Sequence, residues 1–96
     1  GTLDMIAGIN IDTAFIGTGG YTADSGFTAG QEGEAAVKAL VISKARTAVA
    51  LTDSSKIGRI LPFTFARLSD FNAVVNDGRL PADFIKEAKR LNITVL

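Results

Sequence analysis

The chain has 96 residues, of which 47% are hydrophobic and 21% charged, and its ten basic and ten acidic residues give a formal net charge of zero. This composition indicates one packed globular domain, or part of one, and argues against disorder. The absence of cysteine and histidine excludes disulfides, thiolate metal sites and histidine-based catalysis. Zero net charge argues against DNA binding by this segment itself. No apolar run approaches the length needed to span a membrane, and no signal peptide is recognisable, so a cytoplasmic protein is expected.

The first third of the chain predicts a helix, a strand and a loop. Thr2–Gly8 reads as one or two helical turns that end at the glycine. Ile9–Gly17 closes with the apolar run Ala14-Phe15-Ile16, which predicts a buried strand. Residues 17–30 are rich in glycine and small polar residues, which predicts a long loop. A loop of this length in a compact domain usually has a function.

The rest of the chain alternates helices with strands. Glu32–Arg46 predicts a helix, because it is rich in alanine and leucine, begins with acidic residues and ends with basic ones. Strands are predicted over Thr47–Thr52, Pro62–Leu68 (half-exposed), Asn72–Asn76 (buried) and Ile93–Leu96. Asp77-Gly78 predicts a turn.

Pro81 fits the first turn of a last helix, whose core-facing stripe is formed by Phe84, Ile85, Ala88 and Leu91. The alternation of strands and helices predicts an α/β fold with a mostly parallel sheet, arranged as a three-layer α/β/α sandwich.

The strongest candidate site follows the strand Thr47–Thr52. There the chain reads Asp53-Ser54-Ser55-Lys56-Ile57-Gly58-Arg59, which places a carboxylate, two hydroxyls and cations at the carboxyl edge of the sheet, where α/β proteins bind ligands. Such groups suit an anionic, hydroxylated ligand such as a phosphorylated sugar. The candidate ligand-binding residues are Asp53, Ser54, Ser55, Lys56 and Arg59. The alternative is a polar turn, with Asp53 capping backbone amides and Lys56 in solvent.

Two further elements are candidates for the same site. Gly17-Thr18-Gly19-Gly20 could offer backbone N–H groups to an anion, or could form a tight turn that needs glycine. No helix follows this loop closely, which argues against dinucleotide binding. Lys38 lies four residues after Glu34, so it either pairs with that carboxylate on a solvated helix face or points toward the ligand.

Taken together, these motifs resemble one protein family. Ile11–Gly20, Gly26-Phe27-Thr28, Val37-Lys38, Asp53–Arg59 and Leu68–Asp77 are similar to the C-terminal effector-binding domain of DeoR-family bacterial transcriptional regulators. The resemblance extends from about residue 2 to the end of the chain. It implies a non-catalytic sensor of a phosphorylated sugar, with no cofactor and no metal, that controls DNA binding by an N-terminal winged helix-turn-helix in repressors of sugar catabolism.

The resemblance also implies that residues 1–96 are the C-terminal portion of that effector domain. The sequence contains no helix-turn-helix. The family's effector domain begins upstream with a strand and a hydroxyl-rich loop that helps to hold the phosphate, and no such segment occurs here. An incomplete domain and an incomplete ligand site are therefore expected.

An enzyme is the main alternative, because the same domain is similar in fold to ribose-5-phosphate isomerase. When the isomerase is aligned with this chain, its acidic motif falls on Gly17 and Gly20, and its glutamate base falls near Lys38. Proton abstraction needs a positioned base, which these residues do not supply, so no catalytic residue is expected.

The other alternative is that this chain is a fragment that forms oligomers and binds no ligand. Phe63 and Phe65 alternate along a short predicted strand, which suggests a subunit contact and a homo-oligomer.

Overall fold

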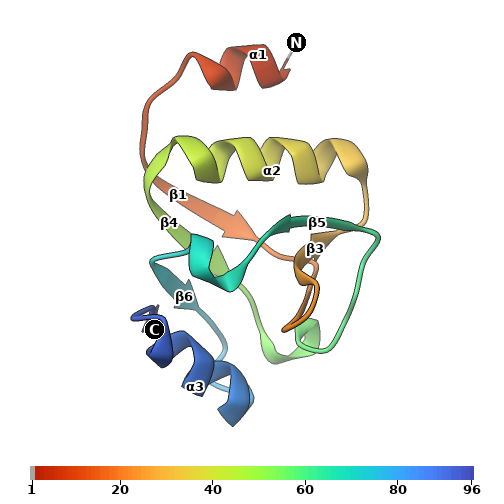
Figure 1. Cartoon of the computed structure of the whole chain (residues 1–96), viewed down its shortest axis with the longest axis vertical. Coiled ribbons are helices and arrows are strands. Elements are labelled where there is room, and N and C mark those ends of the chain that lie inside the picture. The colour runs from red at the N-terminus through yellow and green to blue at the C-terminus, as the bar shows by residue number, and fades with distance from the viewer. Residues whose placement is uncertain (1) are drawn as a thin grey trace.

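The computed structural model, which describes residues 2–96, contains a parallel sheet (Figure 1). Across this sheet the strands lie in the order β1 (Ile11–Gly17), β4 (Ala45–Leu51), β6 (Ala73–Val75) and β7 (Thr94–Val95). The register pairs Gly17 with Leu51 and Leu51 with Val75. The carboxyl ends of β1, β4 and β6 therefore meet at one edge, which we call the carboxyl edge. The predicted α/β class with a mostly parallel sheet is confirmed.

A second, antiparallel sheet corrects the prediction for residues 17–30. It consists of β2 (Gly20–Thr22), β3 (Gly26–Ala29) and β5 (Phe63–Ala66). The prediction of a loop over residues 17–30 is therefore wrong, since this segment forms a hairpin. β5 pairs with β3 and not with the parallel strands. The many glycines of this segment favoured the loop prediction, although Tyr21 and Phe27 are aromatic residues suited to strands.

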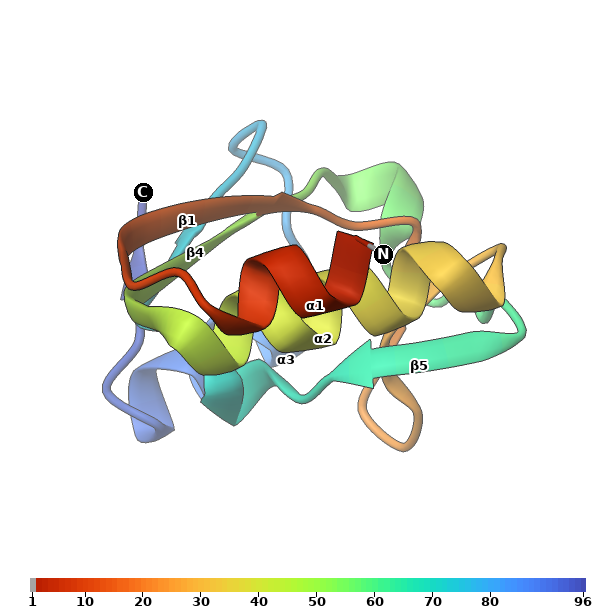
Figure 2. The same ribbon diagram turned by 90° about the horizontal axis from the view of Figure 1, so that it is seen from above.

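The helices are close to their predicted positions. They are α1 (Thr2–Ala7), α2 (Glu32–Lys44) and α3 (Ala82–Arg90), with short 3₁₀ turns η1 (Ser54–Lys56) and η2 (Leu68–Asp70). α2 ends two residues earlier than predicted, because Ala45 and Arg46 already belong to β4. α1 lies along α2 (Figure 2). On α3, Phe84 and Ala88 are buried, which confirms the predicted core stripe.

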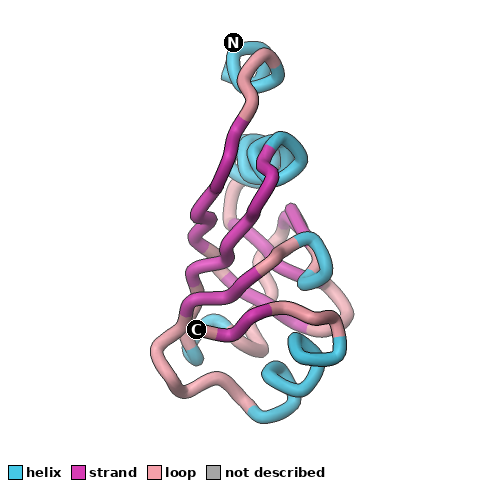
Figure 3. The backbone as a smooth tube through the Cα atoms, turned by 90° about the vertical axis from the view of Figure 1, so that its left-hand side faces the viewer, coloured by secondary structure: helices cyan, strands magenta, loops and turns pink. Residues whose placement is uncertain are grey.

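The two faces of the parallel sheet have different environments. Figure 3 shows α2 and α3 on the same side of it. On β1, Ala14 and Ile16 are buried, whereas Phe15, between them, is 64% exposed. Leu51 and Val75, on the neighbouring strands, are also partly exposed. The prediction that β1 is fully buried is therefore wrong for one of its faces, because no described element packs against it.

The core is centred on aromatic rings that join the two sheets. Phe27 is fully buried, and its ring centroid lies 4.6 Å from that of Tyr21, 5.1 Å from that of Phe71 and 6.4 Å from that of Phe65. The predicted subunit contact through Phe65 is wrong, since that side chain is only 7% exposed. Only Phe63, at 36% exposure, presents its ring to solvent on this strand.

Candidate functional site

A cavity of about 370 Å³ opens at the carboxyl edge, where β4 and β6 end. We call it the edge cavity; its lining residues are Leu51, Thr52, Asp53, Lys56, Val75, Asn76 and Asp77. It joins Asp53 and Lys56, which the sequence predicted, to Asn76 and Asp77, which it did not. The signal for Asp77 was present, because this residue follows β6 as Asp53 follows β4. It was predicted as part of a turn and of the Leu68–Asp77 segment that resembles the family, but not as a site residue.

Asp53 caps the turn that carries Lys56. Its Oδ1 accepts a hydrogen bond from the Ser55 backbone N–H at 2.8 Å and another from the Ser55 hydroxyl. These two hydrogen bonds, with a smaller contribution from the charge of Lys56, hold the pKa of Asp53 below its ordinary value of 3.8. The capping alternative for Asp53 is thus confirmed, and the Ser55 hydroxyl is engaged within the turn.

Replacing Asp53 by asparagine is expected to weaken the acid sensitivity of the fold. A carboxyl group whose folded pKa is depressed stabilises the protein above its unfolded pKa, and this contribution is lost as the pH falls through the folded pKa. The loss should therefore appear below about pH 4. Urea unfolding at a series of acidic pH values should show a shallower decline for Asp53→Asn than for the wild type. Asp12→Asn, at the opposite end of β1, is the matched control; equal slopes for Asp53→Asn and wild type would contradict the prediction.

Asp77 connects the loops that follow β4 and β6. Its Oδ2 accepts hydrogen bonds from the Ser54 hydroxyl at 3.2 Å and the Ser54 N–H at 3.4 Å, and its Oδ1 accepts one from the Arg79 N–H at 3.1 Å. Partial desolvation acts to raise the pKa of Asp77, but these hydrogen bonds outweigh it and lower the pKa overall. Asp77 is therefore ionised at neutral pH and fixes the start of η1.

Asn76 stabilises the same edge through two side-chain hydrogen bonds. Its side-chain amide donates to the Leu96 carbonyl at 2.7 Å, and its Oδ1 accepts from the Gly78 N–H at 2.6 Å. These bonds hold the end of the chain beside β6 and shape the turn at Asp77-Gly78. The predicted turn is thus built by a side chain of the preceding residue.

Two groups in the edge cavity have unused hydrogen-bonding capacity. Within residues 2–96, no hydrogen bond or ion pair holds the Lys56 ammonium group. The Thr52 hydroxyl is buried and likewise lacks a partner among the described residues, although the Thr52 N–H donates to the Val75 carbonyl at 3.0 Å. The Lys56 ammonium group, which lines the cavity, is therefore the group here with most to gain from a ligand, whereas the Thr52 hydroxyl oxygen is enclosed within the fold.

Lys38 lies near the end of β1. Its Nζ donates to the Gly17 carbonyl at 2.7 Å, lies 3.9 Å from Glu34 Oε1, and sits 5.2 Å from the centroid of the Phe65 ring. The structure therefore brings Lys38 and Gly17 together and also confirms the Glu34 pair. Neither residue lines the edge cavity.

The backbone amides after β1 are already used within the fold. The Thr18 N–H and hydroxyl both donate to the Leu51 carbonyl, each at 3.3 Å, and the Gly19 N–H donates to the Thr28 carbonyl at 3.3 Å. Gly20 packs against the Arg59 carbonyl so closely that a Cβ there would collide with it. Ligand contact by these residues stays a prediction, as it does for Arg59, which does not line the edge cavity.

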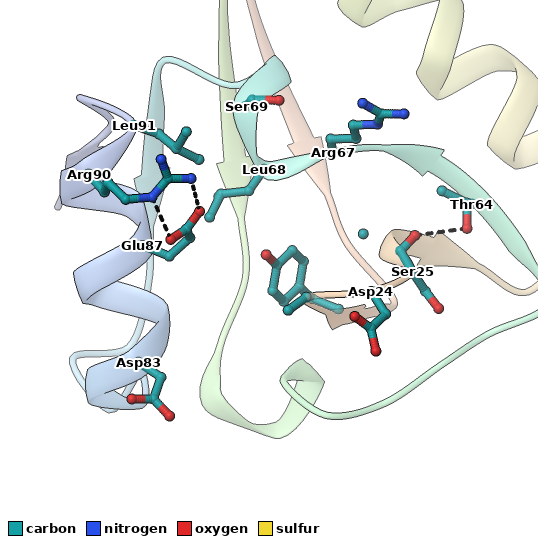
Figure 4. A pocket seen from close by; sticks show the side chains of 13 residues that line it. Asp24, Ser25, Thr64, Arg67, Leu68, Ser69, Asp83, Glu87, Arg90 and Leu91 are labelled. Carbon is teal, nitrogen blue, oxygen red and sulfur yellow. Dashed lines mark hydrogen bonds and ion pairs between the residues drawn. The ribbon is translucent and has the colours of Figure 1, made fainter.

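A larger cavity of about 850 Å³ lies between α3 and the small sheet (Figure 4). Its lining residues are Tyr21, Ala23, Asp24, Ser25, Gly26, Thr64, Arg67, Leu68, Ser69, Asp83, Glu87, Arg90 and Leu91. The Arg90 guanidinium pairs with Glu87 through Nε at 2.9 Å. Burial and, secondly, the Glu87 charge raise the pKa of Tyr21. None of the predicted ligand-binding residues lines this cavity, which is assembled from separate segments and left no local motif.

Two features are absent from residues 2–96. No group of three His, Cys, Asp or Glu side chains in this part of the chain is arranged to hold a metal ion. None of the helices that the structure describes combines the length and apolar character needed to cross a membrane.

Comparison with known proteins identifies the family. Residues 1–78 match the family described as the DeoR C terminal sensor domain. The HTH-type transcriptional regulator GlpR of Haloferax volcanii is 37% identical over 91% of this chain and 34% of its own length. The HTH-type transcriptional repressor GlcR of Bacillus subtilis is 30% identical over 82% of the chain and 30% of its own length. The putative sgc region transcriptional regulator of Escherichia coli is 27% identical over 92% of the chain and 34% of its own length.

The chain thus spans about a third of the length of the curated relatives it matches. The family match covers most of the chain and includes β1, Lys38, the Asp53–Arg59 segment and the edge cavity. This chain belongs to the family of DeoR C-terminal sensor domains.

Proposed function

We propose that this chain is the phosphosugar-sensing part of a DeoR-family transcriptional regulator and that it binds its ligand at the edge cavity. The observation that carries the proposal is the Lys56 ammonium group, which lines a cavity at the carboxyl edge without a hydrogen-bond partner among the described residues. Ligands of open α/β sheets bind at this edge, and the family match makes a sensor the natural function. The names of the relatives, which are transcriptional regulators, support the regulatory role.

The proposed site combines residues with different support. Lys56 would act as a point charge toward a phosphate or hydroxyl group, on a turn fixed by Asp53, Ser54 and Ser55. Lys38 would supply a second cation at the end of β1. The remaining members are proposed from their sequence motifs and from the family resemblance, and they are Gly17, Thr18, Gly19, Gly20 and Arg59.

A binding function is favoured over catalysis by the chemistry of the edge. Asp53 and Asp77 both have lowered pKa values, and a carboxylate of low pKa is a weak general base at neutral pH. The positions that align with the isomerase's acidic groups are Gly17, Gly20 and Lys38. We therefore propose no enzymatic activity. Proton exchange at C2 of a sugar phosphate, catalysed by the chain, would support the isomerase alternative.

Regulation would follow from unequal binding to two conformations. A ligand that binds one state of the sensor better shifts the equilibrium toward it, and a coupled DNA-binding segment responds to that shift. The winged helix-turn-helix that the resemblance implies is not among these residues, so DNA contact is assigned to another segment. We propose a cytoplasmic location on the same grounds.

Homo-oligomerisation also stays a proposal. Its support is the outer face of the parallel sheet, which exposes Phe15, Leu51 and Val75, since contiguous exposed apolar groups mark interaction surfaces. Light scattering over a range of concentrations tests it, and a constant monomer mass would contradict it.

A thermal-shift measurement tests the proposed function. Glucose 6-phosphate, fructose 1-phosphate, fructose 6-phosphate and glycerol 3-phosphate are the probes. At 100 times the dissociation constant, a ligand stabilises the folded state by about 2.7 kcal/mol, which should raise the melting temperature of a chain of this size by roughly 10–20 °C. Lys56→Ala is expected to abolish the shift.

Lys86→Ala is the matched control, because Lys86 is an exposed lysine on α3 outside the edge cavity. It should retain the shift of the wild type. A shift that survives Lys56→Ala would refute the assignment of the site, and the absence of a shift with every probe would refute sugar-phosphate sensing by this chain.

A further inference from the structure

The cavity between α3 and the small sheet, which we call the helix cavity, shares no lining residue with the edge cavity. Its volume of about 850 Å³ is within the range of roughly 300–1,000 Å³ that small-molecule sites occupy. The buried part of its lining consists of Tyr21, Gly26 and Leu68, whereas Asp24 and Asp83 are exposed (Figure 4). A buried lining surrounded by polar groups is the usual structure of a site for an organic molecule.

The Tyr21 hydroxyl is the polar group of this buried lining. Tyr21 is only 8% exposed, and its ring centroid lies 4.6 Å from that of Phe27 and 5.0 Å from that of Phe84. No hydrogen bond within residues 2–96 holds the hydroxyl. Among the described residues, the only enclosed side-chain oxygen or nitrogen without a partner is Thr52 Oγ1, so the unpaired Tyr21 oxygen has accessible surface. A phenol that packing holds in place and that opens into a cavity can both donate to and accept from a ligand.

Glu87 is the nearest charge that acts on this phenol. Burial and, secondly, the charge of Glu87 raise the pKa of Tyr21, so the phenol is neutral at neutral pH. The Glu87 carboxylate accepts from Arg90 through both of its oxygens, which lowers the pKa of Glu87. Each of these oxygens still has a lone pair for a further donor. An ammonium group placed between the phenol oxygen and Glu87 would donate to both.

The charges around the helix cavity favour a positive ligand. Three carboxylates, those of Asp24, Asp83 and Glu87, line it, together with the guanidinium groups of Arg67 and Arg90. Arg90 pairs with Glu87, and Figure 4 shows the Arg67 side chain directed away from Asp24. Neither Asp24 nor Asp83 forms an ion pair in the described part of the chain. The excess of negative charge attracts a cation and repels an anion, and salt screens both effects because these side chains are exposed.

We propose that the helix cavity binds an organic amine, whose ammonium group contacts the Tyr21 hydroxyl and Glu87 and whose carbon chain packs against Leu68 and Leu91. The proposal is independent of the sensor function proposed above, because the two cavities have separate linings. This domain then has sites for two ligands of opposite charge, a phosphorylated sugar at the edge cavity and an amine at the helix cavity.

Tyrosine fluorescence tests the proposal directly. Tyr21 is the only tyrosine of the chain, which has no tryptophan, so the intrinsic emission arises chiefly from the helix cavity. The probes are putrescine, butanediol and succinate, which have chains of equal length and end groups that are positive, uncharged and negative. At constant ionic strength, millimolar putrescine should change the emission in a saturable way, and the other two probes should not. No response to putrescine, or an equal response to butanediol, would overturn the proposal.

Tyr21→Phe removes the hydroxyl and keeps the ring. Its melting temperature should be close to that of the wild type, because no hydrogen bond within the fold is lost. Isothermal titration should show that the affinity for putrescine falls about fivefold to tenfold. Asp83→Asn should also weaken binding at low salt, with a smaller effect at high salt. Asp12→Asn, the same charge change at the far end of β1, should leave the affinity unchanged. An unchanged affinity in Tyr21→Phe would contradict the contact with the phenol and overturn the assignment.

Lys56→Ala separates this proposal from the sensor function. It removes the cation of the edge cavity, so the tyrosine response to putrescine should be the same as in the wild type. Loss of that response in Lys56→Ala would place the amine at the edge cavity and overturn the assignment to the helix cavity. If no sugar phosphate binds but putrescine does, with the expected loss in Tyr21→Phe, the sensor function fails and the amine site stands.

Discussion

Replacing Phe27 by alanine is expected to lower the free energy of unfolding by about 3–5 kcal/mol, the usual cost of removing a fully buried aromatic side chain. Phe27 has no exposed surface, and its ring lies among those of Tyr21, Phe65 and Phe71. The truncation would remove the contacts that join the hairpin β2–β3 to the rest of the core. The free energy of unfolding of a single domain is only about 5–15 kcal/mol, so the expected loss is a large part of it.

Urea unfolding followed by far-ultraviolet circular dichroism measures this loss. Phe63→Ala is the control, since Phe63 occupies β5 of the same small sheet but is 36% exposed. It should cost about 1 kcal/mol. Equal losses in the two variants would mean that the small sheet is not anchored through Phe27 and that its arrangement is wrong.

The features that the sequence predicted well are those with a local signal. α2 and α3 have charge and apolar patterns of helical period, and β4 is an apolar run between polar residues. Such patterns depend only on near neighbours in the chain, so they can be read without knowledge of the fold. The boundaries that moved, such as the end of α2 at Lys44, lie where helix gives way directly to strand without a turn residue.

The hairpin over residues 20–29 was missed because its cause is not local. Gly20 and Gly26 are needed where other segments approach, at the Arg59 and Ala66 carbonyls, and these neighbours are unknown until the chain has folded. The exposed face of β1 was missed for a similar reason. An apolar residue such as Phe15 indicates burial, whereas its exposure depends on which other segments are available to cover it.

The residues of the candidate site likewise fall into those with a local sequence signal and those whose position depends on the fold. Asp53 and Lys56 were predicted because they follow a recognisable strand in one short segment. Asp77 and Thr52 were not, because their positions depend on the pairing of β4 with β6 and on a buried hydroxyl that lacks a partner among the described residues. Lys38 donates a hydrogen bond to the Gly17 carbonyl, and its part in ligand binding stays a prediction.

Replacing Gly20 by alanine is expected to lower the free energy of unfolding by about 3 kcal/mol, at the upper end of the usual cost of overpacking. A Cβ at this position would collide with the Arg59 carbonyl oxygen and lie 3.0 Å from Thr28 Oγ1. The first neighbour is backbone and cannot rotate away, so β2 or the Arg59 segment must move. Chemical denaturation compared with the wild type measures the loss.

Gly17→Ala is the matched control that separates packing from ligand contact. A Cβ at Gly17 would meet nothing within 4 Å, so the stability of the fold should change by no more than about 0.5 kcal/mol. If the turn after β1 cradles the ligand, as the resemblance implies, Gly17→Ala should weaken sugar-phosphate binding while the fold is intact. If affinity is unchanged in Gly17→Ala and stability falls only in Gly20→Ala, the glycines of this turn serve packing, and ligand recognition belongs to the edge cavity. A stable Gly20→Ala variant would instead contradict the close approach of Arg59 on which this argument depends.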